Sequence, residues 1–432
     1  MTPAARLAAA IEVIQSVETV RRPVADVLKE WGRSHRFAGS GDRAALSSLV
    51  YDALRRRASA AWLMGEETPR AVLLGMLRLG RGLDVETIAT LFDGTRYGPA
   101  ALSDDERARL AEGSLDGAPA FVAGDYPEWL DAPLAAVFGE ERAREGAALA
   151  ERAPLDLRVN TLKATPAEAA AALAHLEPVA AAWSPLALRI QLPADGKAPP
   201  VTAEPAYLKG EVEIQDEGSQ IAAILAAPPP GGQVLDLCAG GGGKTLECAA
   251  LMDNAGQIYA YDADIRRLAP IHERLARAGV RNVQVRTPRG RADVLADLAG
   301  RMDLVLVDAP CTGTGTWRRN PDAKWRIRPG ALAERVRDQA AILDAAATYV
   351  KPGGRLAYIT CSLLDEENGA QIRGFLTRHA GFTLVPPADL PLALGPTGLA
   401  LRTAALLRPE GVMLTPRRTG TDGFFVGVLA RG

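Results

Sequence analysis

Two cysteines lie directly after stretches of sequence that read as buried β-strands. A stretch at 303–308 is followed by Ala-Pro and then Cys311, and a stretch at 355–360 is followed directly by Cys361. A glycine-rich turn at 240–243 follows a third stretch of the same kind. In an open α/β sheet, ligands bind at the carboxyl ends of the strands. The spacing therefore predicts thiol chemistry beside a bound ligand.

The two thiols and a nearby acid suit one particular reaction. Neighbouring strands lie ~4.8 Å apart, so Cys311 and Cys361 converge next to Asp308 if their strands pair. Carbon 5 of cytosine is a poor nucleophile, but a thiolate added at carbon 6 activates it. A carboxylate can hold the pyrimidine edge, and a second thiol can assist release. A lone cysteine is more often inert packing, which is the interpretation that fits Cys248.

The glycine turn indicates a cofactor that contains a nucleoside. Glycines at 240–243 allow close approach of the backbone, and the following helix start can face an anionic group. Lys244 and Thr245 fit a phosphate-binding loop, but its required first glycine falls on Cys238. Asp262 ends the next strand, where an acid accepts hydrogen bonds from ribose hydroxyls. The alternative is a helix cap at Asp262 with purely structural glycines.

Composition restricts the class of protein. The 432 residues exceed one ordinary core, and 48% are apolar with a formal charge of −2. The four cysteines show no CxxC spacing and the four histidines no ligand pattern, so we expect neither a zinc site nor a disulfide scaffold. No signal peptide or membrane span is visible, so we expect a cytoplasmic protein without membrane or metal partners.

Two basic strips raise the question of nucleic-acid binding. One is 55–57, which holds three arginines, and the other is 318–328, where four arginines and Lys324 surround Asp322. Such clusters can neutralise phosphates, which is the hypothesis retained here. Arginine-rich surfaces that are simply solvated are the common alternative.

Hydrophobic periodicity divides the chain into three domains. Residues 1–150 show only helical spacing and predict an all-α domain. Residues 154–228 read as a small α+β connector, closed by a Pro-Pro-Pro-Gly-Gly run at 228–232. Residues 229–432 alternate strand and helix, which predicts an α/β doubly wound sheet with a closing hairpin-like edge from 412 to 429.

Several segments match a family. The chain resembles the Sun/Nop/Fmu (RsmB-type) RNA cytosine-5 methyltransferases, which use S-adenosylmethionine and have a Rossmann-like class I fold. The matching segments are 158–161, 236–245, 308–315, 319–322, 358–362 and 422–425. The helical first domain, including 39–43, resembles the NusB-type RNA-binding domain that some members carry. The resemblance implies an RNA partner, with ribosomal RNA as the expected substrate.

The resemblance also implies roles by position. Cys361 would be the covalent nucleophile, Cys311 would assist product release, and Asp308 would contact both cofactor and base. Asp262 would hold the ribose of the cofactor. The methionine end would lie along Cys238, Ala239, Gly240, Gly241, Gly242, Gly243 and Lys244.

This chain departs from the family at two places. The loop usually has Ala-Pro where Gly240 and Gly241 stand here. The third strand usually ends in an acid that holds the adenine, but here no acid follows before Asp293, so adenine recognition is unassigned. A non-catalytic RNA-binding assembly factor on the same scaffold is the leading rival function, and a P-loop ATPase is a distant third. The RNA, the target cytosine and the oligomeric state are not encoded in these motifs.

Overall fold

The computed structural model describes residues 1–20, 22–193, 198–290 and 292–432. The chain forms two compact units. The first is built mainly from Met1–Arg152 and Trp317–Arg328, and the second from Ala153–Leu192, Ala198–Thr316 and Pro329–Gly432. The short insertion at 317–328 thus belongs to the first unit although the sequence on both sides of it belongs to the second.

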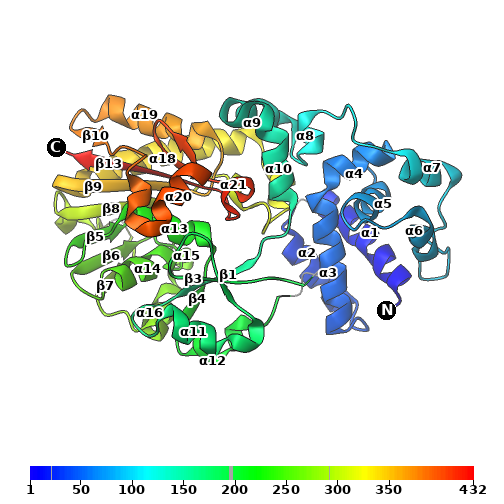
Figure 1. Cartoon of the computed structure of the whole chain (residues 1–432), viewed down its shortest axis with the longest axis horizontal. Helices are drawn as coiled ribbons and strands as arrows, with labels where there is room; N and C mark the ends of the chain where they lie inside the picture. The colour runs from blue at the N-terminus through cyan, green and yellow to red at the C-terminus, as the bar shows by residue number, and fades with distance from the viewer. Residues whose placement is uncertain (21, 194–197, 291) are drawn as a thin grey trace. The chain divides into compact units, whose positions relative to one another are not determined.

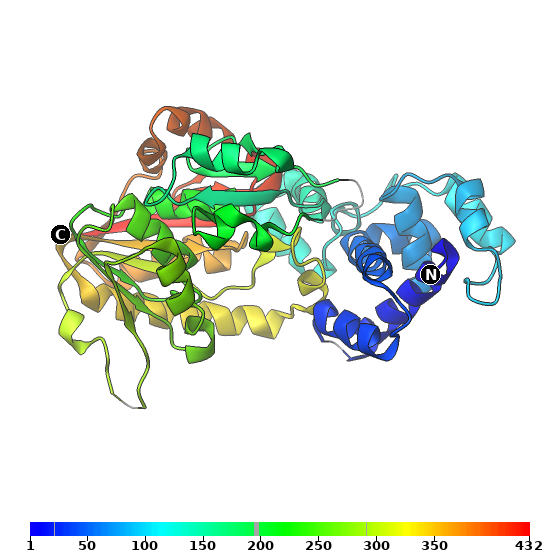
Figure 2. The ribbon, with the colours of Figure 1, turned by 90° about the horizontal axis from the view of Figure 1, so that it is seen from below.

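The first unit is helical, and its helices from the first 125 residues are drawn in blue to cyan in Figure 2. Thr68 and Asp84 cap α5 (Pro69–Leu79) and α6 (Val85–Leu91), and Ser103 with Glu106 forms a capping box before α7 (Asp104–Glu112). Its α-helices are α1 (Pro3–Val20), α2 (Val24–Ser34), α3 (Ser40–Arg55), α4 (Arg57–Met64), α5 (Pro69–Leu79), α6 (Val85–Leu91), α7 (Asp104–Glu112), α8 (Ala120–Ala123), α9 (Asp131–Phe138), α10 (Arg142–Ala150) and the inserted α17 (Ala323–Arg326).

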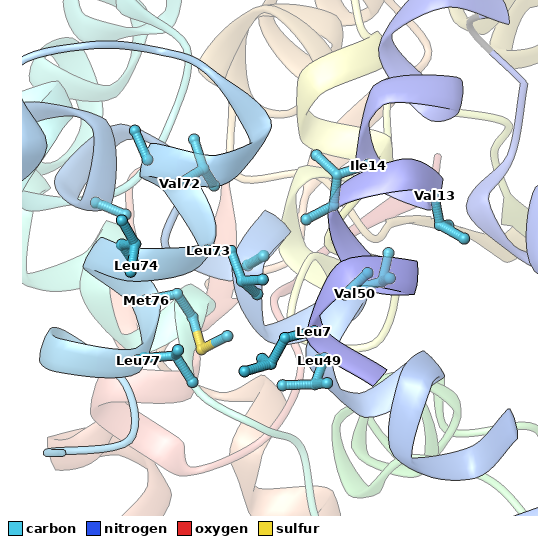
Figure 3. Packing of buried hydrophobic residues seen from close by; sticks show 14 of the residues in the cluster. Leu7, Val13, Ile14, Leu49, Val50, Val72, Leu73, Leu74, Met76 and Leu77 are labelled. Carbon is cyan, nitrogen blue, oxygen red and sulfur yellow. The ribbon is translucent and has the colours of Figure 1, made fainter. Parts of the chain in front are cut away.

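The core of this unit lies between α1, α3 and α5. Leu7 and Ile14 of α1 recur at the spacing of one helix face and pack against Leu49 of α3 and Leu73 and Met76 of α5 (Figure 3). All of these side chains are buried. Glycine at 75 allows α5 to approach α4, because a β-carbon there would lie 2.5 Å from the carbonyl oxygen of Ala60.

The second unit begins with a small four-stranded sheet. Its strands are β1 (Leu155–Val159), β2 (Val179–Ala180), β3 (Ala187–Ile190) and β4 (Val212–Ile214), in the antiparallel order β2-β3-β1-β4. The helices α11 (Pro166–Ala172) and α12 (Pro205–Leu208) share its apolar core. This is the α+β module that the sequence predicts.

The larger sheet has the order β11-β12-β13-β9-β8-β5-β6-β7, with β10 paired to β13. Figure 1 labels the strands β7, β6, β5, β8 and β9 in this spatial order. The five strands from β7 to β9 are parallel, whereas β13 runs antiparallel to β9. The bounds are β5 (Gln233–Asp236), β6 (Gln257–Tyr261), β7 (Val283–Arg286), β8 (Met302–Asp308), β9 (Val350–Thr360), β10 (Phe382–Leu384), β11 (Leu406–Arg408), β12 (Gly411–Leu414) and β13 (Phe424–Arg431).

Helices between the strands cover the sheet. Leu304 and Leu306 of β8 pack in a core that also holds Ile221 of α13 and Ala249 of α14, while α18 contacts β8 and β9. The helices are α13 (Glu217–Ala226), α14 (Gly243–Leu251), α15 (Ile265–Leu268), α16 (Ile271–Ala278), α18 (Pro329–Tyr349), α19 (Gly369–Arg378), α20 (Pro396–Ala404) and α21 (Pro416–Thr419).

The predicted fold class, a doubly wound Rossmann-like sheet preceded by a helical region and an α+β connector, is confirmed. The predicted antiparallel edge is also found, because β12 pairs with β13. The division into domains at 1–150, 154–228 and 229–432 remains our proposal. No helix among the described residues is both long and apolar enough to cross a membrane.

The structure of the insertion at 317–328 bears on the hypothesis that the basic strip at 318–328 binds RNA phosphates. Lys324 is buried, and its ammonium donates to the backbone oxygens of Arg55 at 2.8 Å and Asp125 at 2.6 Å. The Trp325 indole donates to the carbonyl of Leu54, and Arg318 is 5% exposed. For Lys324 and Arg318 the hypothesis is wrong, because their side chains are taken out of solvent by their own unit.

The other basic strip is also engaged within the first unit. Arg55 donates to the backbone oxygens of Glu151 and Arg318, and Arg56 forms an ion pair with Glu151. Arg57 pairs with Glu18 at 3.1 Å and lies over the Trp325 ring. These arginines connect helices of the unit to one another and to the insertion. Because they already have partners, they are weaker candidates for phosphate contacts than the sequence suggested.

Candidate active site

The two cysteines predicted to converge do so at the carboxyl ends of adjacent parallel strands. Asp308 of β8 pairs in register with Ile359 of β9, so the loops that follow these strands start side by side. The Sγ atoms of Cys311 and Cys361 are 3.3 Å apart. The hydrogen bond to Cys361, together with burial, raises the pKa of the Cys311 thiol well above its ordinary value. Cys311 therefore keeps its proton and can donate it toward Cys361.

A buried glutamate holds the loop of Cys311. Glu367 is fully buried, and its Oε1 accepts from the Thr312 backbone N–H at 2.8 Å while Oε2 accepts from the Thr312 hydroxyl. Gln339 of α18 donates to Glu367 at 3.0 Å and to the Pro310 carbonyl at 3.0 Å. The residues on both sides of Cys311 are thus tied to one carboxylate.

The loop of Cys361 is joined to the loop of Cys311 by backbone hydrogen bonds. Gly315 donates its N–H to the Cys361 carbonyl at 2.9 Å, and Gly423 donates to the Gly315 carbonyl at 2.8 Å. A β-carbon at Gly315 would lie 2.3 Å from the Gly423 oxygen. Thr314 adds a side-chain contact, because its Oγ1 accepts from the Leu363 N–H at 2.8 Å. Only glycine at 315 permits this approach, which fixes the distance between the two thiol loops.

Lys244, at the start of α14, reaches the same place. Its Nζ donates to Asp308 Oδ2 at 2.8 Å and lies 5.0 Å from the centre of the Phe424 ring. Burial disfavours the ammonium, but the charges of Asp308 and Cys361 outweigh it and raise the lysine pKa. The ion pair therefore joins the glycine turn to the strand that precedes Cys311, with a permanent positive charge near Cys361.

The glycine turn is connected to Asp262 at the end of β6. Gly240 has φ of 50° and donates its N–H to Asp262 Oδ2 at 2.9 Å, and Oδ1 accepts from the Asp264 N–H at 2.9 Å. Gly242 has φ of 83°, and a β-carbon there would lie 2.6 Å from Ile271. Both glycines occupy the left-handed region that other residues avoid, so the sharp turn depends on them.

The remaining predicted cofactor residues line or support this turn. Ala239 donates its N–H to the Tyr261 carbonyl at 2.8 Å, and Gly241 accepts from Arg274 at 2.6 Å. Gly243 accepts from Arg158 at 2.8 Å. Burial raises the pKa of the Cys238 thiol, so this cysteine stays neutral beside the turn.

A cavity of about 340 Å³ opens beside the turn. Its wall includes Cys238, Asp262, Asp293, Pro310 and Tyr349 of α18. A volume of this order is typical of small-ligand sites, ~300–1,000 Å³. Because Pro310 immediately precedes Cys311, the cavity ends close to the thiol loops.

Three groups that matter for the geometry were not assigned from the sequence. Glu367 and Gln339 carry no motif that links them to Cys311. Asp293 was noted only as the first acid after β7, yet it lines the cavity together with Asp262. Its Oδ1 accepts from the Leu295 N–H at 3.0 Å, which holds the segment after β7 in place. The segment between Arg286 and Asp293 is longer than a tight strand–helix turn, and this length was the available signal.

Arg158 supports the turn from the connector sheet. The side chain is 2% exposed and lies 3.4 Å from Glu247 Oε2 of α14. Burial raises the pKa of Glu247 to about 7, and the Arg158 charge opposes this rise. Burial likewise raises the pKa of Asp236, at the end of β5, to about 7. The Asp236 carboxylate accepts a hydrogen bond from the Thr245 hydroxyl at 2.6 Å. Buried polar pairs of this kind fix the first turn of α14, where Lys244 stands.

No cluster of histidine, cysteine and acidic side chains within the described ranges could hold a metal ion. Titratable groups at the site instead gather as a thiol pair, a lysine–aspartate ion pair and an acid beside a glycine turn. This set suits covalent chemistry on a ring next to a bound nucleoside.

Two family models match the chain. Residues 223–430 match the model described as 16S rRNA methyltransferase RsmB/F, and residues 126–196 match the ferredoxin-like domain of RsmF/B-like methyltransferases. The second match begins in the last helices of the first unit and covers most of the small sheet. The first match contains both thiol loops and the glycine turn.

Relatives with assigned names align over much of the chain. "Ribosomal RNA small subunit methyltransferase B" of Sodalis glossinidius is 35% identical over 338 residues, which cover 78% of this chain and 70% of that protein. The protein of the same name from Enterobacter sp. is 34% identical over 310 residues, covering 71% of this chain and 66% of its own length.

Solved structures share the architecture. "Crystal Structure of PH0851" superposes with a TM-score of 0.70 at 27% identity and covers 99% of both chains. A methyltransferase homologue from Pyrococcus horikoshii has a TM-score of 0.57 at 27% identity and covers 72% of this chain and 98% of its own. The likeness therefore extends over the thiol loops, the glycine turn and the small sheet.

Proposed function

Because the chain belongs to the RsmB/F family of 16S rRNA methyltransferases, we propose that it transfers a methyl group from S-adenosylmethionine to carbon 5 of a cytosine in ribosomal RNA. The observation that carries this proposal is the pair of thiols 3.3 Å apart, on loops that follow adjacent strands. The named relatives are ribosomal RNA small subunit methyltransferases, which favours small-subunit RNA as the substrate.

The cavity suits S-adenosylmethionine. The left-handed glycines at 240 and 242 let a ligand approach the backbone, and Asp262 offers a carboxylate to ribose hydroxyls. Asp293 lines the same cavity and is our candidate for the group that holds the adenine amine. The methionine end would lie along Cys238 to Lys244, toward Asp308. When bound there, the cofactor supplies a methyl group on a positively charged sulfur.

The residues of the chain prepare the cytosine. The Cys361 thiolate forms a bond to carbon 6, which moves the electron pair of the 5,6 double bond onto the ring and makes carbon 5 nucleophilic. Asp308, held by Lys244, stands where its carboxylate can hold the base edge by accepting a hydrogen bond.

Release of the product requires two bonds to break. Once carbon 5 carries the methyl group, its hydrogen passes to water as a proton, and the electron pair of that C–H bond forms the 5,6 double bond. The Cys361–carbon 6 bond breaks in the same step, and its electrons return to sulfur. Cys311 is protonated and 3.3 Å away, so it can exchange a proton with Cys361 as that thiolate leaves. The two cysteines thus have different tasks.

Replacement of each thiol tests this division. Cys311→Ala should accumulate an RNA–protein adduct that survives denaturing electrophoresis, because addition proceeds while release stalls. Cys361→Ala should form neither adduct nor methylated RNA. Cys248→Ala is the matched control, since its thiol is buried in α14 and should leave both readouts unchanged.

Two outcomes would contradict the proposal. Methylated RNA from Cys361→Ala would show that another group is the nucleophile. Absence of S-adenosylmethionine binding by the wild-type protein in calorimetry would instead favour the non-catalytic assembly factor on the same scaffold.

A further inference from the structure

Phe37 is the most exposed large apolar side chain in the helical unit, with 74% of its surface accessible. It stands in the turn between α2 and α3. A single exposed apolar residue is ordinary on protein surfaces. What distinguishes Phe37 is the rigidity of its support and the exposed cations that precede it in the chain.

The turn that carries Phe37 is held by packing and hydrogen bonds. The His35 ring stacks on Trp31 with centroids 4.3 Å apart, and Phe37 meets His35 edge to face at 5.7 Å. The Nδ1 atom of His35 donates to the Trp31 carbonyl at 3.0 Å. Arg43 of α3 donates from Nε to the Ala38 carbonyl at 3.0 Å, which closes the turn. The exposed ring is therefore presented by a fixed scaffold.

Three cations accompany it. Lys29 and Arg33 are one helical turn apart on α2, and Arg36 precedes Phe37 in the chain; all three are exposed. Within the described part of the chain none of them forms an ion pair, unlike Arg55, Arg56 and Arg57. We call Lys29, Arg33, Arg36 and Phe37 the Phe37 patch.

The acids near the patch are mostly engaged elsewhere. Glu30 pairs with Arg22, and Asp42 is taken by the Met1 amine at 3.0 Å and by Arg6 at 2.8 Å. Asp26, one turn nearer the start of α2, is an exposed acid for which the described residues supply no ion-pair partner. The four residues of the patch therefore comprise three exposed cations and one exposed apolar ring.

We propose that the Phe37 patch binds single-stranded RNA, with a base stacked on Phe37 and phosphates held by Arg33 and Arg36. This deepens the proposed function, on which it rests, by giving the RNA substrate a contact surface in the helical unit. A ring flanked by cations is the combination that single-stranded nucleic acid requires, since bases stack on aromatic faces and the backbone follows positive charge. It takes the place of the two basic strips at 55–57 and 318–328, because Arg55, Arg56 and Arg57 have partners within the unit and Arg318 and Lys324 are buried.

Fluorescence anisotropy with a short single-stranded oligocytidine tests the stacking contact. Phe37→Ala should weaken binding about tenfold or more, because loss of one stacked base has an effect of that order. Phe37→Trp should restore it. Tyr97→Ala is the matched control, since Tyr97 is also exposed in this unit, at 68%, beside Arg96 at 5.3 Å, but lacks the three cations.

A salt series tests the phosphate contacts. The double variant Arg33→Ala with Arg36→Ala should lower the slope of log affinity against log salt by about 1.4, since each contact to single-stranded phosphate contributes ~0.7.

A duplex of the same length is a further control for the stacking contact. Its affinity should change in neither the Phe37 nor the Tyr97 variant, because its bases are already stacked.

The outcomes separate this inference from the proposed function. If Phe37→Ala binds oligocytidine as the wild type does, and the arginine variant keeps the full slope, the patch serves something other than RNA and the inference is overturned. Calorimetry with S-adenosylmethionine reports on the cavity alone and should be unchanged in every patch variant. Failure of the wild type to bind that cofactor would overturn the proposed function and not the patch.

Discussion

At the scale of single residues, the site places a protonated thiol and an anchored acid beside Cys361, the proposed nucleophile. Cys311 retains its proton because Cys361 and burial raise its pKa, and Lys244 fixes Asp308. The thiol loops are fixed by groups outside the motifs, above all Glu367, which accepts hydrogen bonds at both oxygens. The position of the Cys311 loop therefore depends on a buried acid that lies outside the motifs.

Glu367→Gln tests this dependence. The amide turns one of two acceptors into a donor that faces N–H or O–H groups, so a buried hydrogen bond worth ~1.5–3 kcal/mol is lost. We expect kcat to fall about tenfold or more, with little change in KM for S-adenosylmethionine. Glu366→Gln is the matched control, since that neighbouring side chain does not hold the Cys311 loop. Unchanged kcat in the Glu367 variant would mean that the loop is positioned without it.

At the scale of elements, the sequence predicted the convergence of the thiols for a simple reason. Adjacent parallel strands end at one edge, so Cys311 and Cys361 had to lie near each other once β8 and β9 paired. The same argument placed Asp262 beside the glycine turn. This argument could not place Glu367 and Asp293, because their positions depend on the paths of loops, which strand periodicity does not encode.

The glycine turn offers a paired test of local geometry. Gly242 adopts φ of 83° with Ile271 2.6 Å from any β-carbon, whereas a β-carbon at Gly243 would meet nothing within 4 Å. Gly242→Ala should therefore cost ~1–2 kcal/mol in backbone strain alone and distort the turn. We expect calorimetry to show much weaker S-adenosylmethionine binding for Gly242→Ala and near-normal binding for Gly243→Ala. Equal affinities in the two variants would show that the turn tolerates a side chain and that its shape is not what binds the cofactor.

At the scale of the whole molecule, the notable feature is a chain that returns to its first unit. The insertion at 317–328 leaves the sheet six residues after Cys311 and joins the helical unit through Lys324 and Trp325. Its basic composition suggested an RNA contact. The sequence did not reveal that Lys324 is buried, because this burial depends on the carbonyls of residues 55 and 125, which are far away in the sequence. Composition alone cannot distinguish such a buried cation from an exposed one. Helical and sheet periodicity, by contrast, sufficed to predict the overall fold class.

Burial of Lys324 should make stability depend on pH. Burial lowers its pKa from 10.5 to about 7, an effect that Asp125 opposes and Arg55 and Arg56 reinforce. Between these two values the unfolded chain binds more protons than the folded one, so this group makes the free energy of unfolding rise with pH. Lys324→Met should remove that rise.

Chemical denaturation at neutral pH and near the ordinary lysine pKa measures the effect. We expect the increase in stability to be smaller in Lys324→Met than in the wild type, although the variant loses stability overall because two buried carbonyls lose their donor. Lys29→Met, at an exposed position, should keep the full increase. An identical increase in wild type and Lys324→Met would mean that Lys324 does not titrate in this range.

The central claim is that Cys361 attacks a cytosine whose carbon 5 then receives the methyl group. Small-subunit ribosomal RNA containing 5-fluorocytidine tests it with the unaltered enzyme, since fluorine at carbon 5 cannot leave as a proton and release is blocked. We predict a covalent complex that forms only with S-adenosylmethionine present, with peptide mapping by mass spectrometry placing the nucleotide on Cys361. A nucleotide attached at Cys311, or methylation without any trapped complex, would contradict the account.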